Sequence, residues 1–455
     1  MQGLAGSRPP ASVGSRNAPT GVRVATQVFD QVLPSSTDVV VVGGGIVGAS
    51  AAFAFAAKGS STVLCEKGYI GGEQSSRALG WVRVMGRDPR DIPLNVESRR
   101  LWQMMHQAVG GETGYRQSGI IYLAERSEEL TAFETWLARA TGLAVDARIV
   151  TAKEAGQLAP QSARTFVGGL YSQGDGRAEP TLAAVAIAEG ARQRGAVIAP
   201  LCAVRGIDTR AGRVAGVVTE KGFIACQAVL LAGGVWSSRF CGNLDIDLPL
   251  LPLNSYALRT AALDGPEICV RGGSLGIRKN LDGGYTIASI RSSADITPDA
   301  IRRAFQYFPA LKHRWATVGL RLGKGFIDNL STPRRWSLDA KTPFEKVRIL
   351  DPGPAPWSDS VWSSATTLFP FLKETSVVEK WGGVIDVTPD SLPIISPARL
   401  PGLFIAAGFS GGGFGAGPAA GQLAAELVLG DRPSVDPAPY RYERFFDGSR
   451  LVVAD

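Results

Sequence analysis

The chain has 455 residues, which is long enough for two or three structural units with substantial cores. Its 45% hydrophobic residues, 20% charged residues and 55 glycines are typical of a soluble, loop-rich α/β protein. The net charge is +7, but the arginines are scattered along the chain and form no basic stripe, so we expect no nucleic-acid partner.

Residues 1–36 are rich in Ser, Pro, Gly and Arg and contain almost no acidic residue. This composition predicts a disordered extension. It resembles an organelle transit peptide weakly, but its prolines oppose an amphipathic helix. The long apolar stretch at 39–57 is interrupted by a glycine turn, so we expect no transmembrane segment. We therefore expect a cytoplasmic protein and leave peripheral attachment to a membrane open.

The first regular elements have the order of a nucleotide-binding unit. Four valines at 39–42 suit a strand that is buried on both faces. The turn that follows has the pattern G-x-G-x-x-G, at Gly43, Gly45 and Gly48. These glycines allow a tight turn, close approach of the backbone to a pyrophosphate, and close packing of helix on strand. Residues 49–57 predict a helix whose N-terminus would face the phosphates.

Glu66 ends the next expected strand, at 62–66, where its carboxylate can accept hydrogen bonds from an adenosine ribose. The glycine motif alone is often a plain turn. Strand, turn, helix, strand and terminal acid in this order are much more specific. The unit therefore predicts a site for an adenine dinucleotide, which could be FAD or NAD.

The middle of the chain alternates helix and strand patterns. Residues 71–80 form a loop of Gly, Ser and Arg. Helices are expected at 92–108 and 182–195; strands are expected at 119–124, 196–199 and 202–204, followed by a hairpin of 213–219 and 223–231. From about residue 245 prolines, aromatics and arginines alternate with short strand patterns, at 256–259 and 284–288, and helices are expected near 298–307 and 309–321. This change indicates a separate, sheet-based unit.

The C-terminal part repeats the order strand, glycine turn and helix, at 403–407, 408–417 and 419–429. So much glycine indicates close approach of the backbone to something large and flat. A helix that begins near Gly417 would point its positive end at that ligand and stabilise the negative charge of a reduced flavin. A nicotinamide enzyme does not need a distant C-terminal segment to return to its cofactor, so the combination favours FAD over NAD.

Cysteine and histidine usage limits the chemistry. The five cysteines (Cys65, Cys202, Cys226, Cys241 and Cys269) contain no C-x-x-C and predict buried free thiols in a reducing compartment. The two histidines, His106 and His313, have no neighbouring ligand, so we expect no metal site. A mechanism must therefore operate without histidine.

Four segments together resemble one family, the FAD-dependent amine and amino-acid oxidoreductases that include D-amino-acid oxidase, glycine oxidase, sarcosine oxidase and D-amino-acid dehydrogenase. They are the unit 39–66, the loop Ser75-Ser76-Arg77, the stretch 232–237 (AGGVWS), and the stretch 381–390 (WGGVIDVTPD) that continues into the C-terminal glycines. The resemblance implies an α/β fold in which a doubly wound, Rossmann-like FAD domain is interleaved with a mixed-sheet α+β substrate domain. It also implies hydride transfer from a C–H next to nitrogen to flavin N5, which gives an imine that hydrolyses.

We expect the following division of the chain. The FAD domain is discontinuous and consists of residues 37–90, 150–245 and 375–435; the substrate domain consists of 91–149 and 246–374; a tail follows at 436–455.

The expected cofactor-binding residues come from the N-terminal unit and from the match to the family. They are Gly43, Gly45, Ile46, Val47, Gly48, Glu66, Lys67, Ser75, Ser76, Arg77, Gly80, Trp81, Val204, Gly233, Trp236, Gly411, Gly412, Gly413, Phe414 and Gly415. By this match, Val204 would contact the adenine side through its backbone, and 411–415 would follow the isoalloxazine edge.

Substrate-binding residues are less well defined. Glycine-oxidase-like members bind the substrate carboxylate with an arginine where this chain has Ile385. A carboxylate clamp needs a planar bidentate cation. Arg83 fits the alternative pattern of sarcosine-oxidase-like members and is our first candidate; a surface or phosphate-facing arginine is the competing interpretation. Tyr256 and Arg278 lie on strands that form the pocket floor in similar proteins and could contact substrate, or they could simply lie at strand edges.

The residues that tether flavin covalently in some members have no counterpart. Gly383 stands in place of the tethering cysteine, and no histidine lies near the flavin motifs to serve as the tether found in other members. We therefore expect noncovalent FAD. Separately, Gly412 stands where relatives often have a histidine within the C-terminal glycines, which could widen the pocket or remove a polar contact.

The substrate could be a D-amino acid, a cyclic imino acid or an N-alkyl amine. The electron acceptor could be oxygen, a quinone or an electron-transfer partner. The oxygen-activating lysine of sarcosine-oxidase-like members has no counterpart here, which favours a dehydrogenase. A 2-hydroxy-acid dehydrogenase of the same fold, an NAD-linked enzyme and a non-catalytic flavin module remain alternatives.

Overall fold

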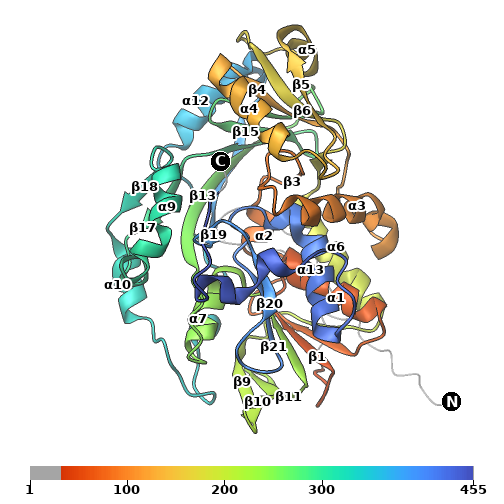
Figure 1. Cartoon of the computed structure of the whole chain (residues 1–455), viewed down its shortest axis with the longest axis vertical. Coiled ribbons are helices and arrows are strands. Elements are labelled where there is room, and N and C mark those ends of the chain that lie inside the picture. Colours follow the sequence, from red (N-terminus) through yellow and green to blue (C-terminus); the bar gives the residue numbers. More distant parts are fainter. Residues whose placement is uncertain (1–31, 454–455) are drawn as a thin grey trace, which may run out of the picture.

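The computed structural model describes residues 32–453, so the extension expected at 1–36 lies almost entirely outside the described residues. Two large sheets organise the molecule. Strands β4 (Ile120–Ala124), β5 (Ala147–Thr151) and β6 (Gly168–Ser172) of the larger one lie at one end of the molecule, and a separate small sheet of β9 (Val204–Arg210), β10 (Arg213–Thr219) and β11 (Gly222–Ala225) lies at the other (Figure 1). Segments that are far apart in the sequence alternate between the two sheets, as an interleaved α/β architecture requires. This bears out the fold class expected from the sequence.

The first sheet has six strands and contains the N-terminal unit. Its strand order is β20 (Ile394–Pro397), β21 (Leu403–Ala407), β12 (Ala228–Leu231), β1 (Val39–Val42), β2 (Thr62–Cys65) and β8 (Val197–Ala199). All neighbouring pairs are parallel except β20 with β21. The sheet is doubly wound, because the strand order reverses at β1.

Both faces of this sheet are covered, which explains the run of four valines. Val39 and Val41 pack with helices on one face, whereas Val40 packs with the three-stranded sheet on the other face. The helices are α1 (Ile46–Ala57), α3 (Ile92–Val109), α6 (Pro180–Gln193) and α13 (Gly413–Leu429). That small sheet has the order β11 (Gly222–Ala225), β10 (Arg213–Thr219) and β9 (Val204–Arg210). The expected hairpin around residues 220–222 is confirmed.

The second sheet has ten strands and forms the other unit. Along its path lie β18 (Val318–Arg321), β17 (Ser292–Asp295), β13 (Leu251–Thr260), β16 (Tyr285–Ser289), β15 (Leu275–Lys279), β14 (Cys269–Gly272), β4 (Ile120–Ala124), β6 (Gly168–Ser172) and β5 (Ala147–Thr151), and β19 (Val377–Val387) pairs with β13. A two-stranded ribbon of β3 (Trp81–Val82) and β7 (Gly176–Arg177) connects the units. Strand β19 carries the segment 381–387 across to the first sheet.

The helices vary in length from one turn to five. They are α1 (Ile46–Ala57), α2 (Gln74–Arg77), α3 (Ile92–Val109), α4 (Ser127–Arg139), α5 (Ala152–Leu158), α6 (Pro180–Gln193), α7 (Ser237–Gly242), α8 (Pro298–Arg302), α9 (Ala304–Arg314), α10 (Lys324–Ser331), α11 (Pro343–Lys346), α12 (Ser358–Leu368) and α13 (Gly413–Leu429), with 3-10 turns η1 (Gly234–Trp236), η2 (Pro370–Glu374), η3 (Ala438–Tyr440) and η4 (Tyr442–Phe445). Between residues 32 and 453, no helix is both long and apolar enough to cross a membrane.

Several sequence-based boundaries differ from the structure. Strand β6 and strand β19 belong to the ten-stranded sheet, although residues 150–245 and 375–435 were assigned to the FAD domain. Long-range pairing with β4 and β13 decides their place, and such pairing leaves no local signal. The helix expected at 309–321 is also wrong in its second half, because α9 ends at Arg314 and residues 318–321 form the edge strand β18.

The strand expected at 223–231 is two strands, β11 and β12, which lie in different sheets. The loop expected at 71–80 contains the short helix α2. All five cysteines are buried and free, as expected. Within the described part of the chain, no group of three or more His, Cys, Asp or Glu side chains could hold a metal ion.

Candidate active site

A cavity lies where the carboxyl ends of the first sheet meet strand β19. The last residues of three parallel strands line it, namely Val42, Cys65 and Leu231. This is the edge at which ligands bind in open parallel sheets. The other lining residues are Gly43, Gly45, Ile46, Val47, Glu66, Lys67, Gly72, Glu73, Gln74, Ser75, Ala78, Val204, Ala232, Gly233, Gly234, Val235, Trp236, Phe240, Phe344, Val384, Ile385, Asp386, Ala406, Phe409, Gly411, Gly413 and Phe414.

The turn between β1 and α1 and the first turn of α1 each require one glycine. Gly43 has φ +109°, and a Cβ there would lie 2.5 Å from the carbonyl oxygen of Ala232. A Cβ on Gly48 would lie 1.9 Å from the carbonyl oxygen of Gly43. The tight turn and the close packing of helix on strand are therefore both present, as the motif predicts.

The N-terminus of α1 points into the cavity and carries a side-chain cap from another segment. Its N-cap residue Gly45 supplies no capping side chain. Instead the hydroxyl of Ser75 accepts the N–H of Ile46 at 2.8 Å. Free N–H groups and the helix dipole make this end attractive to an anion such as a phosphate.

Glu66 holds the turn in place from the end of β2. One carboxylate oxygen accepts the N–H of Gly44 at 2.7 Å, and the other accepts the N–H of Gly68 at 2.6 Å. Burial raises the pKa of Glu66, and the nearby Lys67 cation and these two N–H groups oppose the rise. Each oxygen keeps a second lone pair that could accept a hydroxyl group of a ligand.

Three segments form a polar wall beside Glu66. The ammonium of Lys67 lies 2.7 Å from Oε1 of Glu73 and 4.6 Å from the ring centre of Trp236. The indole N–H of Trp236 donates to Oε2 of Glu73 at 3.0 Å. Glu73 thus ties the loop after β2 to the segment after β12.

The C-terminal glycines serve two purposes. Helix α13 begins at Gly413, four residues earlier than expected, so part of the glycine run lies inside the helix. A Cβ on Gly415 would lie 2.9 Å from the carbonyl oxygen of Trp81, and one on Gly417 would lie 2.8 Å from the side chain of Ile46. These two glycines therefore let α13 approach other protein segments, whereas Gly411 and Gly413 line the cavity.

Asp386 is the buried acid at the β19 end of the cavity. Its Oδ2 accepts the N–H of Gly408 at 2.5 Å, which joins strand β19 to the start of the glycine turn. Burial raises the pKa of Asp386 to about 6, against the opposing effect of the backbone N–H groups around it. The carboxylate therefore helps to position the turn, although burial makes its charged form unfavourable.

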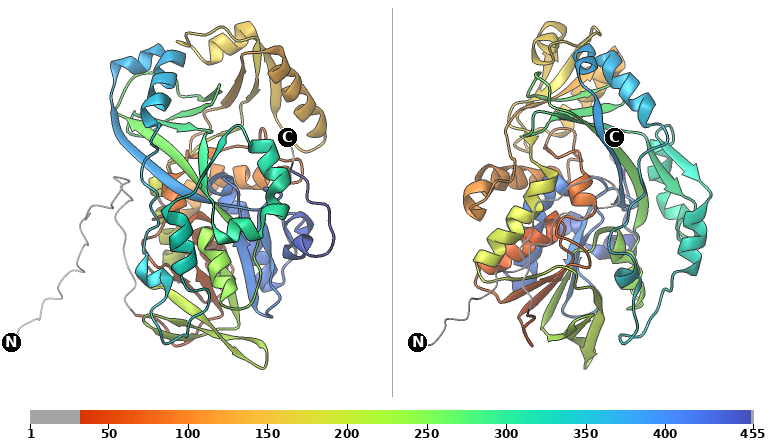
Figure 2. Two further views of the ribbon diagram at one scale, coloured as in Figure 1. Left: turned by 90° about the vertical axis from the view of Figure 1, so that its left-hand side faces the viewer. Right: turned by 180° about the vertical axis from the view of Figure 1, so that it is seen from behind.

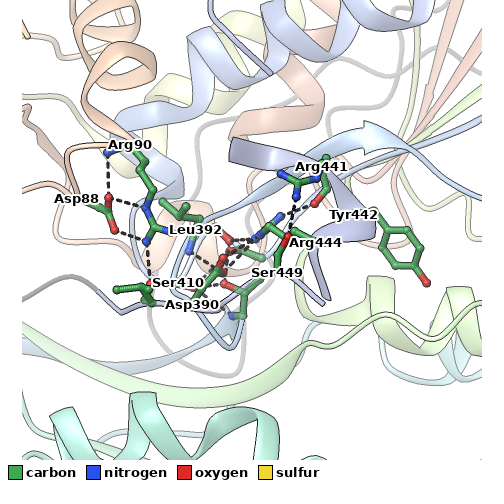
Figure 3. Close-up of polar contacts among 12 residues, drawn as sticks. Asp88, Arg90, Asp390, Leu392, Ser410, Arg441, Tyr442, Arg444 and Ser449 are labelled. Atoms are coloured by element: carbon green, nitrogen blue, oxygen red, sulfur yellow. Dashed lines mark hydrogen bonds and ion pairs between the residues drawn. The ribbon is translucent and has the colours of Figure 1, made fainter. Parts of the chain in front are cut away.

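The C-terminal tail fastens the same turn from outside (Figure 3). Arg444 forms a buried ion pair with Asp390 and donates to the carbonyl oxygen of Leu392 at 2.9 Å. Ser410, within the turn, exchanges a hydrogen bond with Thr388 at 3.3 Å. The segment that follows β19 is thus held between the tail and the glycine turn.

Most of the expected cofactor-binding residues meet at the cavity, and seven of them do not line it. Those outside are Gly48, Ser76, Arg77, Gly80, Trp81, Gly412 and Gly415. Arg77, for example, is buried and donates to the carbonyl oxygen of Glu73 at 3.0 Å, and its own carbonyl accepts the indole N–H of Trp381. Arg77 therefore connects α2 to strand β19 from outside the cavity.

None of the three expected substrate-binding residues lines the cavity. Arg83 donates to the carbonyl oxygen of Met85 at 2.7 Å. Arg278 is buried against Glu179 in an ion pair and donates to the carbonyl oxygen of Leu79. The hydroxyl of Tyr256 is buried 2.8 Å from Ser293 Oγ. In this structure all three side chains are occupied by structural contacts.

Sequence reasoning missed Gln74 and the apolar pair Val384 and Phe409. Gln74 Oε1 is buried without a hydrogen-bond partner in a residue that lines the cavity, so a polar group is available to a ligand there. Gln74 is adjacent to the serines of the family motif, which is the one signal that could have identified it. Val384 lies on β19 opposite Asn254 of β13, and this register cannot be read from the sequence.

A second, larger cavity of about 990 Å³ adjoins the first, and the two share Val235, Trp236 and Val384. Its walls are strongly charged: Arg239, Arg302, Arg303, Arg321, Arg334 and Arg335 line it together with Asp245, Asp247, Asp295, Asp299 and Asp328. Arg239 donates to the carbonyl oxygens of Thr332 and Pro333, both at 3.0 Å, and not to a carboxylate.

Comparison with known proteins agrees with this geometry. Residues 38–427 match the family described as FAD dependent oxidoreductase. The solved structure of the L-amino acid deaminase from Proteus myxofaciens in complex with anthranilate is 31% identical, with a TM-score of 0.90, and covers 94% of this chain and 97% of its own. The sarcosine oxidase subunit beta of Rhizobium meliloti is 27% identical and is matched over 90% of this chain and 89% of its own length.

Mitochondrial dimethylglycine dehydrogenase of Mus musculus is 25% identical over 96% of this chain but only 47% of its own length. The chain thus spans about half the length of the mammalian relatives that it matches.

Proposed function

The chain belongs to the family of FAD-dependent oxidoreductases, and we propose that it oxidises the carbon–nitrogen bond of an L-amino acid. The Proteus myxofaciens relative, which aligns over almost the whole of both chains, is an L-amino acid deaminase and supports this substrate class. Other relatives are named for the N-methylated amino acids dimethylglycine and sarcosine, so a secondary amine is the nearest alternative. The observation that carries the proposal is one cavity built jointly by both ends of the chain.

The residues of this cavity fit FAD. The ribose would meet the lone pairs of Glu66, and the pyrophosphate would meet the N-terminus of α1 beside Ser75. The unpartnered Gln74 Oε1 and the open backbone at Gly411 suit the flat ring at the other end. Bound FAD would supply an acceptor for a hydride, which carries two electrons. We expect it to be held without a covalent bond.

The protein's own contribution is orientation and exclusion of water. Val384, Ile385 and Phe409 form an apolar wall at the β19 end of the cavity. The amino group of the substrate would lose its ammonium proton to bulk solvent before the substrate enters this apolar site, so no histidine is required for the hydride to leave the α-carbon. The imine product then takes up water and releases ammonia and a keto acid. Positioning of this kind supplies much of the rate enhancement in reactions whose chemistry a cofactor performs.

We propose that the substrate approaches through the second cavity. Arginine side chains outnumber aspartates among its lining residues, which favours a substrate with a carboxylate. Among the lining arginines, Arg239 is the nearest in sequence to Trp236, which lines both cavities. Its guanidinium donates to carbonyl oxygens only, so no ion pair within the described residues neutralises its positive charge. Ile385, in contrast, cannot bind a carboxylate.

The decisive experiment is anaerobic reduction of the purified yellow protein by a panel of substrates. We expect L-amino acids to bleach the flavin absorbance, and D-amino acids, N-methylated amino acids and 2-hydroxy acids to do so slowly or not at all. Fast bleaching by 2-hydroxy acids alone would overturn the proposal in favour of C–O oxidation. Fast bleaching by N-methylated amino acids alone would assign a secondary amine. Re-oxidation by air or by a soluble quinone then identifies the class of electron acceptor.

A further inference from the structure

One segment that borders both cavities has no buried residue. Residues 347–354 are all described, and none of them is buried or belongs to a helix or strand; we call them the strap. Val347, Leu350 and Pro352 of the strap line the second cavity, whereas Phe344, just before it, lines the first. Such a segment can move away from the protein at a much lower free-energy cost than a core strand or helix.

The two ends of the strap are fixed in different hydrophobic cores. Phe344 of helix α11 is buried beside Trp236 and Phe240 in a core of the first sheet. After the strap the chain enters α12, the light-blue helix near the top of both panels of Figure 2, which packs on the ten-stranded sheet through Val361 and Ala365. The part that can move is therefore the strap itself, between two fixed ends.

Polar contacts hold the strap against the rim of the first cavity. The ammonium of Lys67 donates to the carbonyl oxygens of Val347 and Arg348, at 3.0 and 2.8 Å. The N–H of Leu350 donates to Oε1 of Glu73 at 2.8 Å. Lys67 and Glu73 both line the first cavity, so the strap is bound directly to the residues that border the cofactor site.

One ion pair joins the strap to the three-stranded sheet. The guanidinium of Arg348 meets the carboxylate of Glu220, in the turn between β10 and β11, with distances of 2.5 Å for Nη1–Oε1 and 2.6 Å for Nη2–Oε2. Burial acts to raise the pKa of Glu220, but pairing with Arg348 and the N–H of Ala203 together lower it. The two side chains are 32% and 17% exposed, so dissolved salt can weaken the pair.

Other walls of the first cavity consist of regular structure. They include the ends of strands β1, β2 and β12, the starts of α1 and α13, and strand β19. Separating these elements would break strand pairing or expose buried side chains. Displacing the strap breaks no strand pairing, and it would widen the connection between the two cavities, which share Trp236 and Val384.

We propose that the strap is the gate through which FAD enters and leaves the protein, and that the ion pair of Arg348 with Glu220 limits the rate of both steps. Opening breaks this ion pair and the hydrogen bonds to Lys67 and Glu73, and the cofactor then passes through the second cavity. Closure restores these contacts over the cofactor site, as a lid does. The proposal concerns the cofactor and is independent of the substrate.

The first test measures the release of FAD from the full-length, flavin-loaded protein. The protein is diluted, and free FAD is separated by filtration and measured at intervals. Arg348→Gln and Glu220→Gln should each release FAD roughly fivefold faster or more, because a partly exposed ion pair is lost. The double variant should release it no faster than the faster single variant, because the two residues act through one contact. Added salt should speed release from the wild type and have little effect on the double variant.

A gate differs from a binding contact in its effect on uptake. After removal of the flavin, the same single variants should take up FAD roughly fivefold faster or more, so that the dissociation constant changes less than either rate. Faster release with unchanged uptake would overturn the proposal, because the ion pair would then only support a contact to bound FAD. Wild-type rates of release and uptake in both single variants would overturn it as well.

A matched control is Arg164→Gln, which removes a partly exposed ion pair at the end of the molecule that carries β4–β6. Nη1 of Arg164 lies 2.7 Å from each carboxylate oxygen of Glu125. This variant should release and take up FAD at the wild-type rates. If it releases FAD as fast as Arg348→Gln does, with an equal fall in melting temperature, general loss of stability explains the effect and the proposal is wrong.

Discussion

Arg444 and Asp390 form a two-point ion pair in the protein interior, with distances of 2.8 Å between Nε and Oδ2 and 3.0 Å between Nη2 and Oδ1 (Figure 3). The side chains are 5% and 2% exposed. The pair connects η4 in the tail to the segment that follows β19, whose backbone continues into contact with the glycine turn. The tail is therefore part of the construction of the cavity.

Replacing one partner should be far more harmful than replacing both. Arg444→Met leaves the Asp390 carboxylate buried and unpaired, which we expect to cost about 3–5 kcal/mol of the free energy of unfolding and to weaken FAD retention. The double variant Arg444→Met/Asp390→Leu should recover at least half of this loss. Urea denaturation and flavin content check both. Equal losses in the single and double variants would contradict the account.

Gly48→Ala should abolish retention of the cofactor. Its new methyl group would lie 1.9 Å from the carbonyl oxygen of Gly43, so the strand and helix of the N-terminal unit must separate. The matched control is Gly156→Ala in helix α5, where nothing lies within 4 Å of the added group and where helix propensity predicts a gain of about 0.5–1 kcal/mol. Flavin absorbance per protein and melting temperature measure the contrast; a yellow Gly48→Ala protein would refute it.

The ionisation of Asp386 predicts a specific pH dependence of stability. Because burial raises its pKa from 3.8 to about 6, the folded protein holds this proton more tightly than the unfolded chain does. Its contribution to the free energy of unfolding therefore falls as pH rises from about 4 to about 6, by about 3 kcal/mol, and is constant above that range.

Asp386→Asn keeps an oxygen that can accept the N–H of Gly408 and removes the ionisation. Relative to the wild type, this variant should gain stability as pH rises through the same window and should be at least as stable at pH about 8. Melting temperatures of both proteins across the window provide the measurement. A variant that is destabilised equally at every pH would show that the charge itself holds the turn.

Arg83→Ala should leave KM for carboxylate substrates within about twofold of the wild-type value. The sequence made Arg83 the first candidate for a carboxylate clamp, but its side chain donates to Met85 and lines neither cavity. Steady-state kinetics on the best substrate of the panel test this. A KM raised by two orders of magnitude would restore the sequence-based assignment.

We expect denaturation to release unmodified FAD, because no covalent bond should hold it to the protein. Gly383 stands where some relatives have a tethering cysteine, and Cys65, the one cysteine among the lining residues, lies beside Glu66 at the ribose end. Acid precipitation should therefore release the yellow colour into the supernatant. Colour retained in the pellet, with a corresponding increase in protein mass, would indicate a covalent bond.

The sequence was most informative where neighbouring residues decide the structure. The strand, turn and helix at 39–57 and the acid Glu66 follow from local pattern, and the structure places them as expected. The start of α13 was misplaced, because packing against α1 outweighs the poor helix propensity of Gly413 and Gly415.

The substrate end could not be read in the same way. Ile385 and Val384 reach the cavity only because β19 pairs antiparallel with β13, with Ile385 opposite Leu253. Arg278 looked available for a ligand, yet it is paired with Glu179, 99 residues away in the chain. Such long-range partners are set by the tertiary fold, and a single sequence contains no local trace of them.

The order of strands in the first sheet has a consequence for biosynthesis. Strand β12 lies between β1 and β21, and β21 is made of residues 403–407. A nascent polypeptide still attached to the ribosome therefore exposes one flank of β12 until residues 403–407 have been made. The site for the prosthetic group is completed equally late, because Gly411 and Gly413, which line it, follow β21 in the chain.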